Sequence, residues 1–246
     1  MVGAMISYEE ERWLTMGTKR KIRVLLADDH AVLREGLRTL LELEGDIDVV
    51  SEAEDGRRAV ELAKIFKPAV VVMDIGMPLL NGLEATRHIL YDSPDTKIII
   101  LSAHNDDIYI DQVLSVGASG YLLKQSSSET ISKAIREVSK GETCFCPSVS
   151  KRIRTQYDKS PIPGKLLRKR NADLTSRELE VIQLVAEGFA NKQIADELAI
   201  SVKTVEKHRQ QLKKKLNIQD TAGLTRYAIS AGIVQTRQVF PTKNRI

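Results

Sequence analysis

Five polar residues stand at the ends of short apolar runs in the first half of the sequence. They are Asp28 and Asp29 after IRVLLA, Asp74 at the end of VVVMD, Ser102 at the end of KIIILS, and Lys124 after GYLL. In an open parallel sheet, the ligand site lies beyond the carboxyl ends of the strands. If these runs are neighbouring parallel strands, all five side chains converge on one crevice.

This set of groups suits phosphoryl transfer. Three carboxylates placed together repel one another, and Mg²⁺, a hard cation that takes oxygen ligands, would resolve the conflict. A carboxylate can also attack phosphorus and form an acyl phosphate, while Lys124 and Ser102 neutralise and orient the transferred group. The sequence contains no phosphate-binding loop of the GxxxxGK[ST] type, so a nucleoside triphosphate site is not expected.

The elements that position these residues alternate between strand and helix. The apolar runs, with VVSEA at 49–53, are rich in Val and Ile, as buried parallel strands are. Helical periodicity between them predicts helices over Val32–Glu44, Ala59–Phe66, Leu83–Tyr91, Ile108–Val116 and Ile131–Lys140. Five strand–helix units predict an α/β fold, a doubly wound sheet of five parallel strands with helices on both faces.

The second half has a different pattern. Residues 142–172 hold several prolines and a basic cluster and are predicted to be a linker. Beyond them, helices are predicted over 176–187, 192–198, 202–216 and 222–231, with Thr175, Asn191 and Ser201 as N-caps. The short turn between the second and third helices predicts a helix-turn-helix. The predicted divisions are an extension at 1–21, a first domain at 22–141, the linker at 142–172 and an all-α domain at 173–238.

Composition excludes several classes of protein. Of the 246 residues, 42% are hydrophobic and 28% charged, as expected for one or two globular domains. No run of 18 uncharged apolar residues occurs, so no membrane span is expected. Glu9, Glu10 and Glu11 interrupt the segment where a secretion signal needs an apolar core. Cys144 and Cys146 form no disulfide framework and fit a reducing, cytoplasmic location.

The net charge of +4 conceals an asymmetry between the halves. Residues 1–150 hold 17 Lys and Arg against 24 Asp and Glu, whereas residues 151–246 hold 20 against 9. An acidic half and a small basic half indicate separate roles, and the basic half suggests a polyanionic partner. A solvated basic surface with no partner is the alternative.

The predicted helix over 202–216 has two contrasting faces. Val202, Val205, Leu212 and Leu216 share one stripe, and Arg209 lies on the same side. The opposite face carries long donors at successive turns, which suits the major groove of DNA. These donors are Lys203, Lys207, Gln210 and Lys214, flanked by Glu206 and Gln211.

Both halves resemble known families. Residues 22–141 resemble a response-regulator receiver domain through Asp28-Asp29, the run VVMDIGMP with Asp74, Leu101-Ser102-Ala103 and Tyr121-Leu122-Leu123-Lys124. The segment from LTSRELEVIQLVAEGF to VEKHRQQLKKKLNI resembles the LuxR-type helix-turn-helix. Together, and in this order, they resemble the NarL/FixJ-type two-component response regulators.

The receiver resemblance implies a role for each site residue. Asp74 would be the phosphoacceptor, and Ser102 and Lys124 would contact the phosphoryl group. Mg²⁺ would be held by Asp28, Asp29, Asp74 and the carbonyl of Gly76. Tyr121 would be the aromatic switch that turns inward with Ser102 on activation. Gly76 and His104 occupy positions that tune phosphoryl lifetime, while Gln125 replaces the proline that many receivers carry after the lysine. His30 is expected to be a surface residue.

The DNA-binding resemblance, combined with the helix faces, assigns contacts to DNA. Lys207 and Gln210 are predicted to contact bases, and the resemblance adds Glu206. Phosphate contacts are predicted for Lys203, Arg209, Lys213 and Lys214, with Thr204 as a further backbone candidate. The helix over 222–231 presents a stripe that could serve the domain core, a dimer contact or both: Leu224, Tyr227, Ala228 and Ala231. The resemblance favours a homodimer.

The sequence therefore predicts a cytoplasmic transcription regulator and not an enzyme. A sensor histidine kinase would phosphorylate Asp74, and phosphorylation would control dimerisation and binding to double-stranded promoter DNA. Three alternatives remain open at this point. They are a phosphatase or phosphotransferase with an aspartyl nucleophile, a regulator that binds DNA without phosphorylation, and an RNA-binding module. Against the first, Gly76 stands where such enzymes usually have a second acid.

Overall fold

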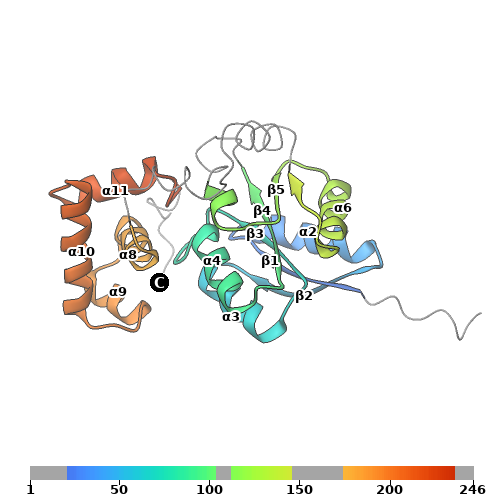
Figure 1. Ribbon diagram of the computed structural model, residues 1–246, viewed down its shortest axis with the longest axis horizontal. Coiled ribbons are helices and arrows are strands. Elements are labelled where there is room, and N and C mark those ends of the chain that lie inside the picture. The colour runs from blue at the N-terminus through green and yellow to red at the C-terminus, as the bar shows by residue number, and fades with distance from the viewer. Residues whose placement is uncertain (1–20, 104–111, 146–173, 236–246) are drawn as a thin grey trace, which may run out of the picture.

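A computed structural model of the chain describes residues 21–103, 112–145 and 174–235, arranged as two lobes (Figure 1). The larger lobe is built on one parallel sheet with the strand order β2-β1-β3-β4-β5-β6. The strands are β1 (Ile22–Ala27), β2 (Ile47–Ala53), β3 (Val70–Asp74), β4 (Lys97–Ser102), β5 (Gly120–Leu123) and β6 (Cys144–Phe145).

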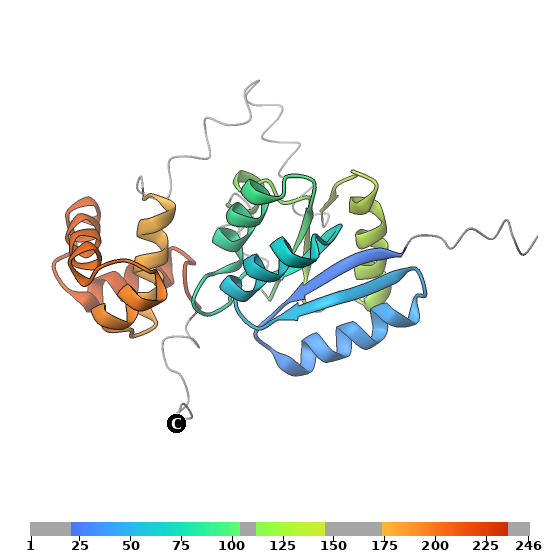
Figure 2. The ribbon, with the colours of Figure 1, turned by 90° about the horizontal axis from the view of Figure 1, so that it is seen from below.

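Helices cover both faces of this sheet (Figure 2). On one face, α2 (Ala31–Leu43) and α6 (Ser128–Ser139) pack on Val24, Val72 and their neighbours. On the other, α3 (Gly56–Phe66) and α4 (Gly82–Asp92) enclose a second core that includes the fully buried Tyr121. The predicted α/β architecture, with a sheet covered on both sides, is confirmed.

The sheet has six strands where five were predicted. Gly120 and Tyr121 of β5 pair with Cys144 and Phe145 of β6, so the segment assigned to the linker begins with a strand. Two residues are too few to show a strand periodicity, so β6 could not be predicted from the sequence. Residues 108–111 of the predicted helix at 108–116 and most of the predicted linker lie outside the described residues; residues 112–115 are helical.

The smaller lobe consists of four helices, as predicted. These are α8 (Ser176–Ala186), α9 (Asn191–Glu197), α10 (Val202–Leu216) and α11 (Thr221–Ser230), and they share one apolar core. Thr175 forms the predicted capping box with Glu178, and Ser201 caps α10. The prediction that Asn191 caps α9 is wrong, because Ala190 is the N-cap and its N–H donates to Gln193 Oε1.

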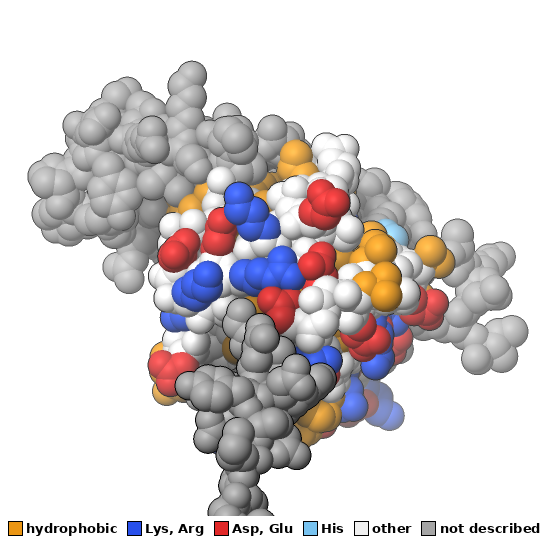
Figure 3. Space-filling model, turned by 90° about the vertical axis from the view of Figure 1, so that its right-hand side faces the viewer, with side chains coloured by type: hydrophobic (Ala, Val, Ile, Leu, Met, Phe, Trp, Pro, Cys, Tyr) orange, Lys and Arg blue, Asp and Glu red, His pale blue; other side chains and the backbone are white. Residues whose placement is uncertain are grey.

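The end of the larger lobe that faces away from the helical lobe has mixed charge. Acidic and basic side chains are interspersed there, with small apolar groups between them (Figure 3). Arg136 pairs with Glu44 and Asp46, and Arg38 pairs with Glu42 and Glu52. This face is not a uniform positive patch, so a polyanion has no evident footprint on it. No helix within the described ranges is long and apolar enough to cross a membrane.

Candidate functional site

The predicted site residues meet at the carboxyl edge of the sheet. Asp74 ends β3 and is 1% exposed, and Ser102 ends β4 and is also buried. Asp28 and Asp29 directly follow β1, and Lys124 directly follows β5. The Lys124 N–H donates to the carbonyl of Ser102 over 2.8 Å, which ties the ends of β4 and β5 together. Parallel pairing of consecutive buried runs therefore produces the convergence that the sequence predicted.

Lys124 is the positive centre of this pocket. Its Nζ lies 2.8 Å from Asp74 Oδ2 and 2.7 Å from Asp28 Oδ2, and the side chain is only 12% exposed. An ammonium between two buried carboxylates offsets their mutual repulsion. The same ammonium is placed to neutralise charge that a phosphoryl group would bring to Asp74.

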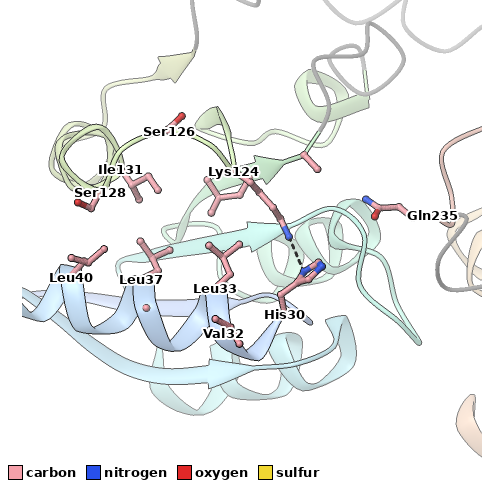
Figure 4. Close-up of a pocket in the computed structure, with 13 residues that line it drawn as sticks. His30, Val32, Leu33, Leu37, Leu40, Lys124, Ser126, Ser128, Ile131 and Gln235 are labelled. Atoms are coloured by element: carbon pink, nitrogen blue, oxygen red, sulfur yellow. Dashed lines mark hydrogen bonds between the residues drawn. The ribbon is translucent and has the colours of Figure 1, made fainter. Parts of the chain in front are cut away.

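His30 is exposed, as predicted, and it also contacts the pocket, which the sequence did not indicate. Its Nδ1 lies 2.8 Å from Asp28 Oδ1, 3.0 Å from Asp29 Oδ1 and 3.3 Å from Lys124 Nζ (Figure 4). The ring is 42% exposed, so it stands at the mouth of the pocket and not in the core. The only sequence signal was its position directly after two site residues, which does not fix the direction of a side chain.

Burial controls the protonation of Asp74. Removal from water raises the pKa of the Asp74 carboxyl above its ordinary value, as does the neighbouring charge of Asp28. The Lys124 ammonium and a hydrogen bond from the Gly76 backbone oppose that rise. A carboxylate in a poorly solvated site is less stabilised by water and is therefore more readily drawn into a bond with phosphorus.

The pocket has the donors that a hard cation requires. Ligand atoms of Asp28, Asp29, His30 and Asp74 all lie within 4.8 Å of one another. Three of these residues are carboxylates, which are oxygen ligands that suit Mg²⁺. The residues present therefore fit a divalent cation.

The predicted switch residues lie close in the sheet but differ from expectation in one respect. Tyr121 on β5 pairs with Ile100 of β4, two residues before Ser102. Its side chain is fully buried in this structure, in the core between the sheet and α3 and α4. Tyr121 thus points into the core in this structure, and its switch role stays a prediction. His104 lies outside the described residues.

The loop that follows Asp74 is held tightly against the sheet. The Gly82 N–H donates to the Ile75 carbonyl, and a Cβ on Gly82 would lie 1.9 Å from the Asp74 carbonyl oxygen. Only glycine fits such a close backbone approach. At the end of the loop, the Asn81 side chain caps α4 by accepting the Leu83 and Glu84 N–H groups. The loop from Asp74 to the capped start of α4 is therefore held at both ends, which leaves its backbone little freedom to move.

One face of α8 is polar and rests on this loop and on α3 and α4. Its contact residues recur at spacings of four, three and four, so they form a stripe on one side of the helix. Ser176 donates to Glu84, and the Glu187 carboxylate accepts the Leu79 N–H over 3.2 Å. The four residues of the stripe, called here the docking stripe, are Ser176, Glu180, Gln183 and Glu187.

Gln183 makes the most buried contact of the docking stripe. It is 0% exposed, and its Oε1 accepts the backbone N–H of Asn81 over 2.8 Å and the Asn81 Nδ2 over 3.2 Å. Its Nε2 donates to the Met77 carbonyl over 3.1 Å. A side chain of the helical lobe thus satisfies backbone groups three and seven residues beyond Asp74. Sequence reasoning missed it, because a lone glutamine on an apolar helix has no local pattern that reveals a distant partner.

Glu180 is the charged contact of the docking stripe. Its carboxylate lies 3.3 Å from Arg57 Nη2 and 3.2 Å from His88 Nε2, and Arg57 also pairs with Glu197 of α9. Burial alone would raise the pKa of Glu180, but the His88 hydrogen bond and the charges of Arg57 and Arg177 outweigh it and lower that pKa. The hydrogen bond to Glu180 raises the pKa of His88 above 6.5, against the effect of burial.

Contact between the lobes is therefore expected to depend on pH. Because its pKa is raised in the docked state, His88 stabilises docking below about pH 6.5, and this contribution disappears as the pH rises through the raised value. The charges that face His88 are Glu180 from α8, Glu84 from α4 and Arg57 from α3. Glu180, whose pKa is lowered, adds stability that is lost only as the pH falls below its ordinary range.

Small-angle scattering between pH 6 and pH 9, at constant ionic strength, would measure this effect. The radius of gyration is expected to increase with pH in the wild type and to change less in His88→Gln. An equally steep increase in His88→Gln would contradict the assignment.

The outward face of α10 is open in this arrangement. The helix lies on the far side of the smaller lobe from the sheet (Figure 1). Lys203, Glu206, Lys207, Gln210 and Lys214 are all exposed, whereas Val205 and Leu212 are buried in the core. Thr204 and Lys213 are half-buried at the edges of this face. The predicted base-contacting residues, with Lys203 and Lys214 of the predicted phosphate-contacting set, thus share one accessible surface, and their roles remain predictions.

Arg209 differs from the other predicted phosphate contacts. Its Nη1 donates to Asn191 Oδ1 over 2.7 Å, and its Nη2 donates to Thr221 Oγ1 over 2.9 Å. The guanidinium therefore links α10 to α9 and α11 within the lobe. Its position on the apolar side of the helix explains this, because a long side chain there meets neighbouring helices before it reaches solvent.

The stripe on α11, for which the sequence left a core role, a dimer contact or both open, is divided between core and surface. Leu224 and Ala228 are fully buried inside the lobe, while Tyr227 and Ala231 are half-buried. The carbonyl of Ala231 accepts Gln112 Nε2 of the larger lobe over 3.3 Å. The stripe therefore serves the domain core first, and the end of α11 contacts the larger lobe.

Known proteins resemble both lobes of this chain. The family described as "Response regulator receiver domain" matches residues 24–136, and "Bacterial regulatory proteins, luxR family" matches residues 172–228. The transcriptional regulatory protein DegU of Brevibacillus brevis is 37% identical over 89% of this chain and 98% of its own length. LiaR of Bacillus subtilis is 41% identical over 84% of this chain and 96% of its own length.

Solved structures give the same result. A LuxR-family two-component response regulator from Aurantimonas is 33% identical, with a TM-score of 0.52 over 56% of this chain and 99% of that one. The RcsB response regulator of Salmonella typhimurium is 27% identical, with a TM-score of 0.57 over 86% of this chain and 98% of that one. An RcsB–DNA complex is 28% identical, with a TM-score of 0.51 over 86% of this chain and 99% of that one.

Proposed function

Because the chain belongs to the response regulators that join a receiver domain to a LuxR-type DNA-binding domain, we propose that phosphorylation of Asp74 by a sensor histidine kinase controls its dimerisation and its sequence-specific binding to DNA. Like its relatives, the chain is a transcriptional regulator and not an enzyme. The observation that carries the proposal is a continuous connection: buried Asp74 contacts Lys124, and the loop after Asp74 is bonded to the DNA-binding domain by Gln183.

The pocket residues divide the transfer between them. A carboxylate oxygen of Asp74 would bond to phosphorus as the bond from the kinase histidine to phosphorus breaks. The Lys124 ammonium would pair with the incoming oxygens, and the Ser102 hydroxyl would donate to one of them. Asp28, Asp29, Asp74 and the Gly76 carbonyl would hold Mg²⁺, which when bound supplies positive charge that shields the phosphoryl oxygens from the carboxylates.

Phosphorylation would act on the docking stripe through Lys124 and the loop. In this structure the Lys124 ammonium pairs with two carboxylates. A phosphoryl group on Asp74 would place roughly two negative charges next to that ammonium. Rearrangement of Lys124 and of the loop after Asp74 would shift the backbone groups that Gln183 binds. Since α10 is already exposed in the docked arrangement, release would expose the α8 and α11 side of the domain, and dimerisation there would be the controlled step.

DNA is the favoured polyanion. The open face of α10 carries Lys203, Lys207 and Lys214, and a solved relative is in complex with DNA. A dimer would place two such helices on two half-sites and so increase affinity for a symmetric site.

We expect Gln183→Ala to separate the two domains without phosphorylation. The substitution leaves the Asn81 N–H and the Met77 carbonyl without their present partner, which costs about 1–3 kcal/mol for each group that stays buried. That cost corresponds to about a 5- to 150-fold shift toward the open arrangement. Small-angle scattering would detect it as an increase in radius of gyration relative to wild type.

Gln211→Ala, on the exposed face of α10, is the matched control and should leave the radius unchanged. If Gln183→Ala folds normally by circular dichroism and scatters like the wild type, Gln183 does not hold the domains together.

The test of the proposed function compares the protein before and after incubation with acetyl phosphate and Mg²⁺. Sedimentation velocity should show a shift from monomer to dimer, and titration of promoter DNA at constant salt should show tighter binding. A phosphorylated protein that stays monomeric and binds DNA with unchanged affinity would refute it. Tighter binding to duplex RNA than to duplex DNA would favour the RNA-binding alternative.

A further inference from the structure

The DNA-binding domain also reaches the mouth of the phosphorylation pocket. Gln235 follows α11, and a Cβ built on Gly76 would lie 2.2 Å from Gln235 Nε2, 2.3 Å from Cδ and 2.7 Å from Oε1. The carboxamide of Gln235 therefore fills the space that a side chain at position 76 would occupy. Gly76 is two residues after Asp74, and its backbone hydrogen bonds to the Asp74 carboxylate.

The same carboxamide lines the hollow beside the pocket. A hollow of about 560 Å³ is bounded by α2, α6 and the strand ends, and its polar lining includes His30, Lys124 and Gln235. Gln235 enters from the DNA-binding domain on the side opposite α2 and α6 (Figure 4). An amide from a second domain thus lines the hollow next to Lys124, the residue that pairs with Asp74.

The segment that carries Gln235 is anchored on both domains. Ile233 and Val234 are buried in the helical core, and the Ile233 N–H donates to Ala228. The Ile233 carbonyl accepts Asn81 Nδ2 over 3.4 Å, and Asn81 is the residue that Gln183 binds. Docking through Gln183 and placement of Gln235 at Gly76 therefore occur together.

We propose that Gln235 is a water-positioning residue that accelerates hydrolysis of the acyl phosphate when the domains are docked. The inference rests on the proposed phosphorylation of Asp74. A carboxamide both accepts and donates hydrogen bonds, so it can hold a water molecule while donating to a phosphoryl oxygen. Glutamine has this role toward the attacking water in GTPases.

The reaction balances with water as the only co-reactant. The water oxygen bonds to phosphorus, and the bond from phosphorus to the Asp74 carboxylate oxygen breaks. The carboxylate keeps the bonding electron pair. Both protons of the water leave with the inorganic phosphate, one on the attacking oxygen and the other on a second phosphate oxygen. In this account, re-docking of the DNA-binding domain ends the signal that released it.

The decay of the phosphorylated full-length chain tests the proposal. The protein is phosphorylated with acetyl phosphate and Mg²⁺, the donor is removed, and intact mass spectrometry follows the loss of the phosphoryl group. Gln235→Ala is expected to lengthen the half-life of the acyl phosphate about 10-fold. Removing a hydrogen-bond donor from a closed active site lowers rates roughly 100-fold or more, and the smaller effect is expected here because docking is reversible. The rate of phosphorylation should stay the same.

Gln235→Met separates positioning from packing. Methionine has a similar length but cannot hold a water molecule by hydrogen bonds. The acyl phosphate of Gln235→Met should therefore decay with the same half-life as that of Gln235→Ala, while small-angle scattering shows that the two domains are docked. Gln219→Ala, at an exposed position between α10 and α11, is the matched control and should decay like the wild type.

Three outcomes would overturn the proposal. They are an unchanged or shorter half-life in Gln235→Ala, a wild-type half-life in Gln235→Met, and faster phosphorylation with unchanged decay, which would make Gln235 a steric plug. Failure of the wild type to accept a phosphoryl group would instead refute the proposed function itself.

Discussion

Asp74→Asn is expected to abolish the response of DNA binding to a phosphodonor. In the wild type, phosphorylation should increase affinity for promoter DNA about 5- to 150-fold, the usual range of coupling between two sites. An amide at position 74 cannot form the acyl phosphate, so the variant should show the same affinity with and without acetyl phosphate. Fluorescence anisotropy with labelled promoter DNA at fixed salt would measure both values.

Asp92→Asn is the matched control for this experiment. Asp92 is exposed at the end of α4, and its substitution makes the same change of charge away from the pocket. It should respond to the phosphodonor like the wild type. A full response in Asp74→Asn would show that the phosphoryl group acts elsewhere, and no response in either protein would favour a regulator that works without phosphorylation.

Substitutions on the open face of α10 are expected to separate base contacts from phosphate contacts. Gln210→Ala should weaken binding to the target site by about 1–3 kcal/mol and relax the preference at one base pair, because a side chain that reads a base edge is lost. Lys214→Ala should weaken binding to all sequences alike and reduce the salt dependence by about one counterion. Anisotropy titrations with target and mutated sites, at several salt concentrations, would distinguish the two effects.

Lys64→Ala, an exposed substitution on α3 of the receiver domain, is the control for loss of one positive charge. It should change neither the affinity nor the salt dependence. If Gln210→Ala weakens all sites equally, Gln210 contacts the backbone of DNA and the base assignment is wrong.

Local patterns predicted the elements and the pocket well. Buried parallel strands have continuous apolar runs, and the polar residue that follows such a run must lie at the carboxyl edge of the sheet. Asp28, Asp74 and Lys124 could therefore be placed together from their spacing alone. The faces of α10 were equally predictable, since 3.6-residue periodicity decides which side chains are buried.

Contacts between the domains could not be predicted in this way. Gln183 and Asn81 are 102 residues apart and meet only because two folded domains meet. Gln235 reaches Gly76 for the same reason. No periodicity or spacing records such a pairing, and the polar residues involved are individually ordinary.

One local prediction failed for a physical reason that propensity does not capture. Asn191 was predicted to cap α9, but it is the first helical residue, and its side chain accepts Arg209 instead. A good capping residue one position away from the cap is used for another hydrogen bond when a strong donor is near. His30 is exposed, as predicted, and its imidazole also contacts the carboxylates of the pocket.

Mapping of the phosphorylated residue tests the central claim most directly. The full-length protein would be incubated with acetyl phosphate and Mg²⁺, digested at low pH to preserve acyl phosphates, and sequenced by tandem mass spectrometry. We predict one phosphoryl group on Asp74, and none in a sample prepared without the donor. A phosphoryl group on another side chain, or none under conditions where the protein is folded, would contradict the account.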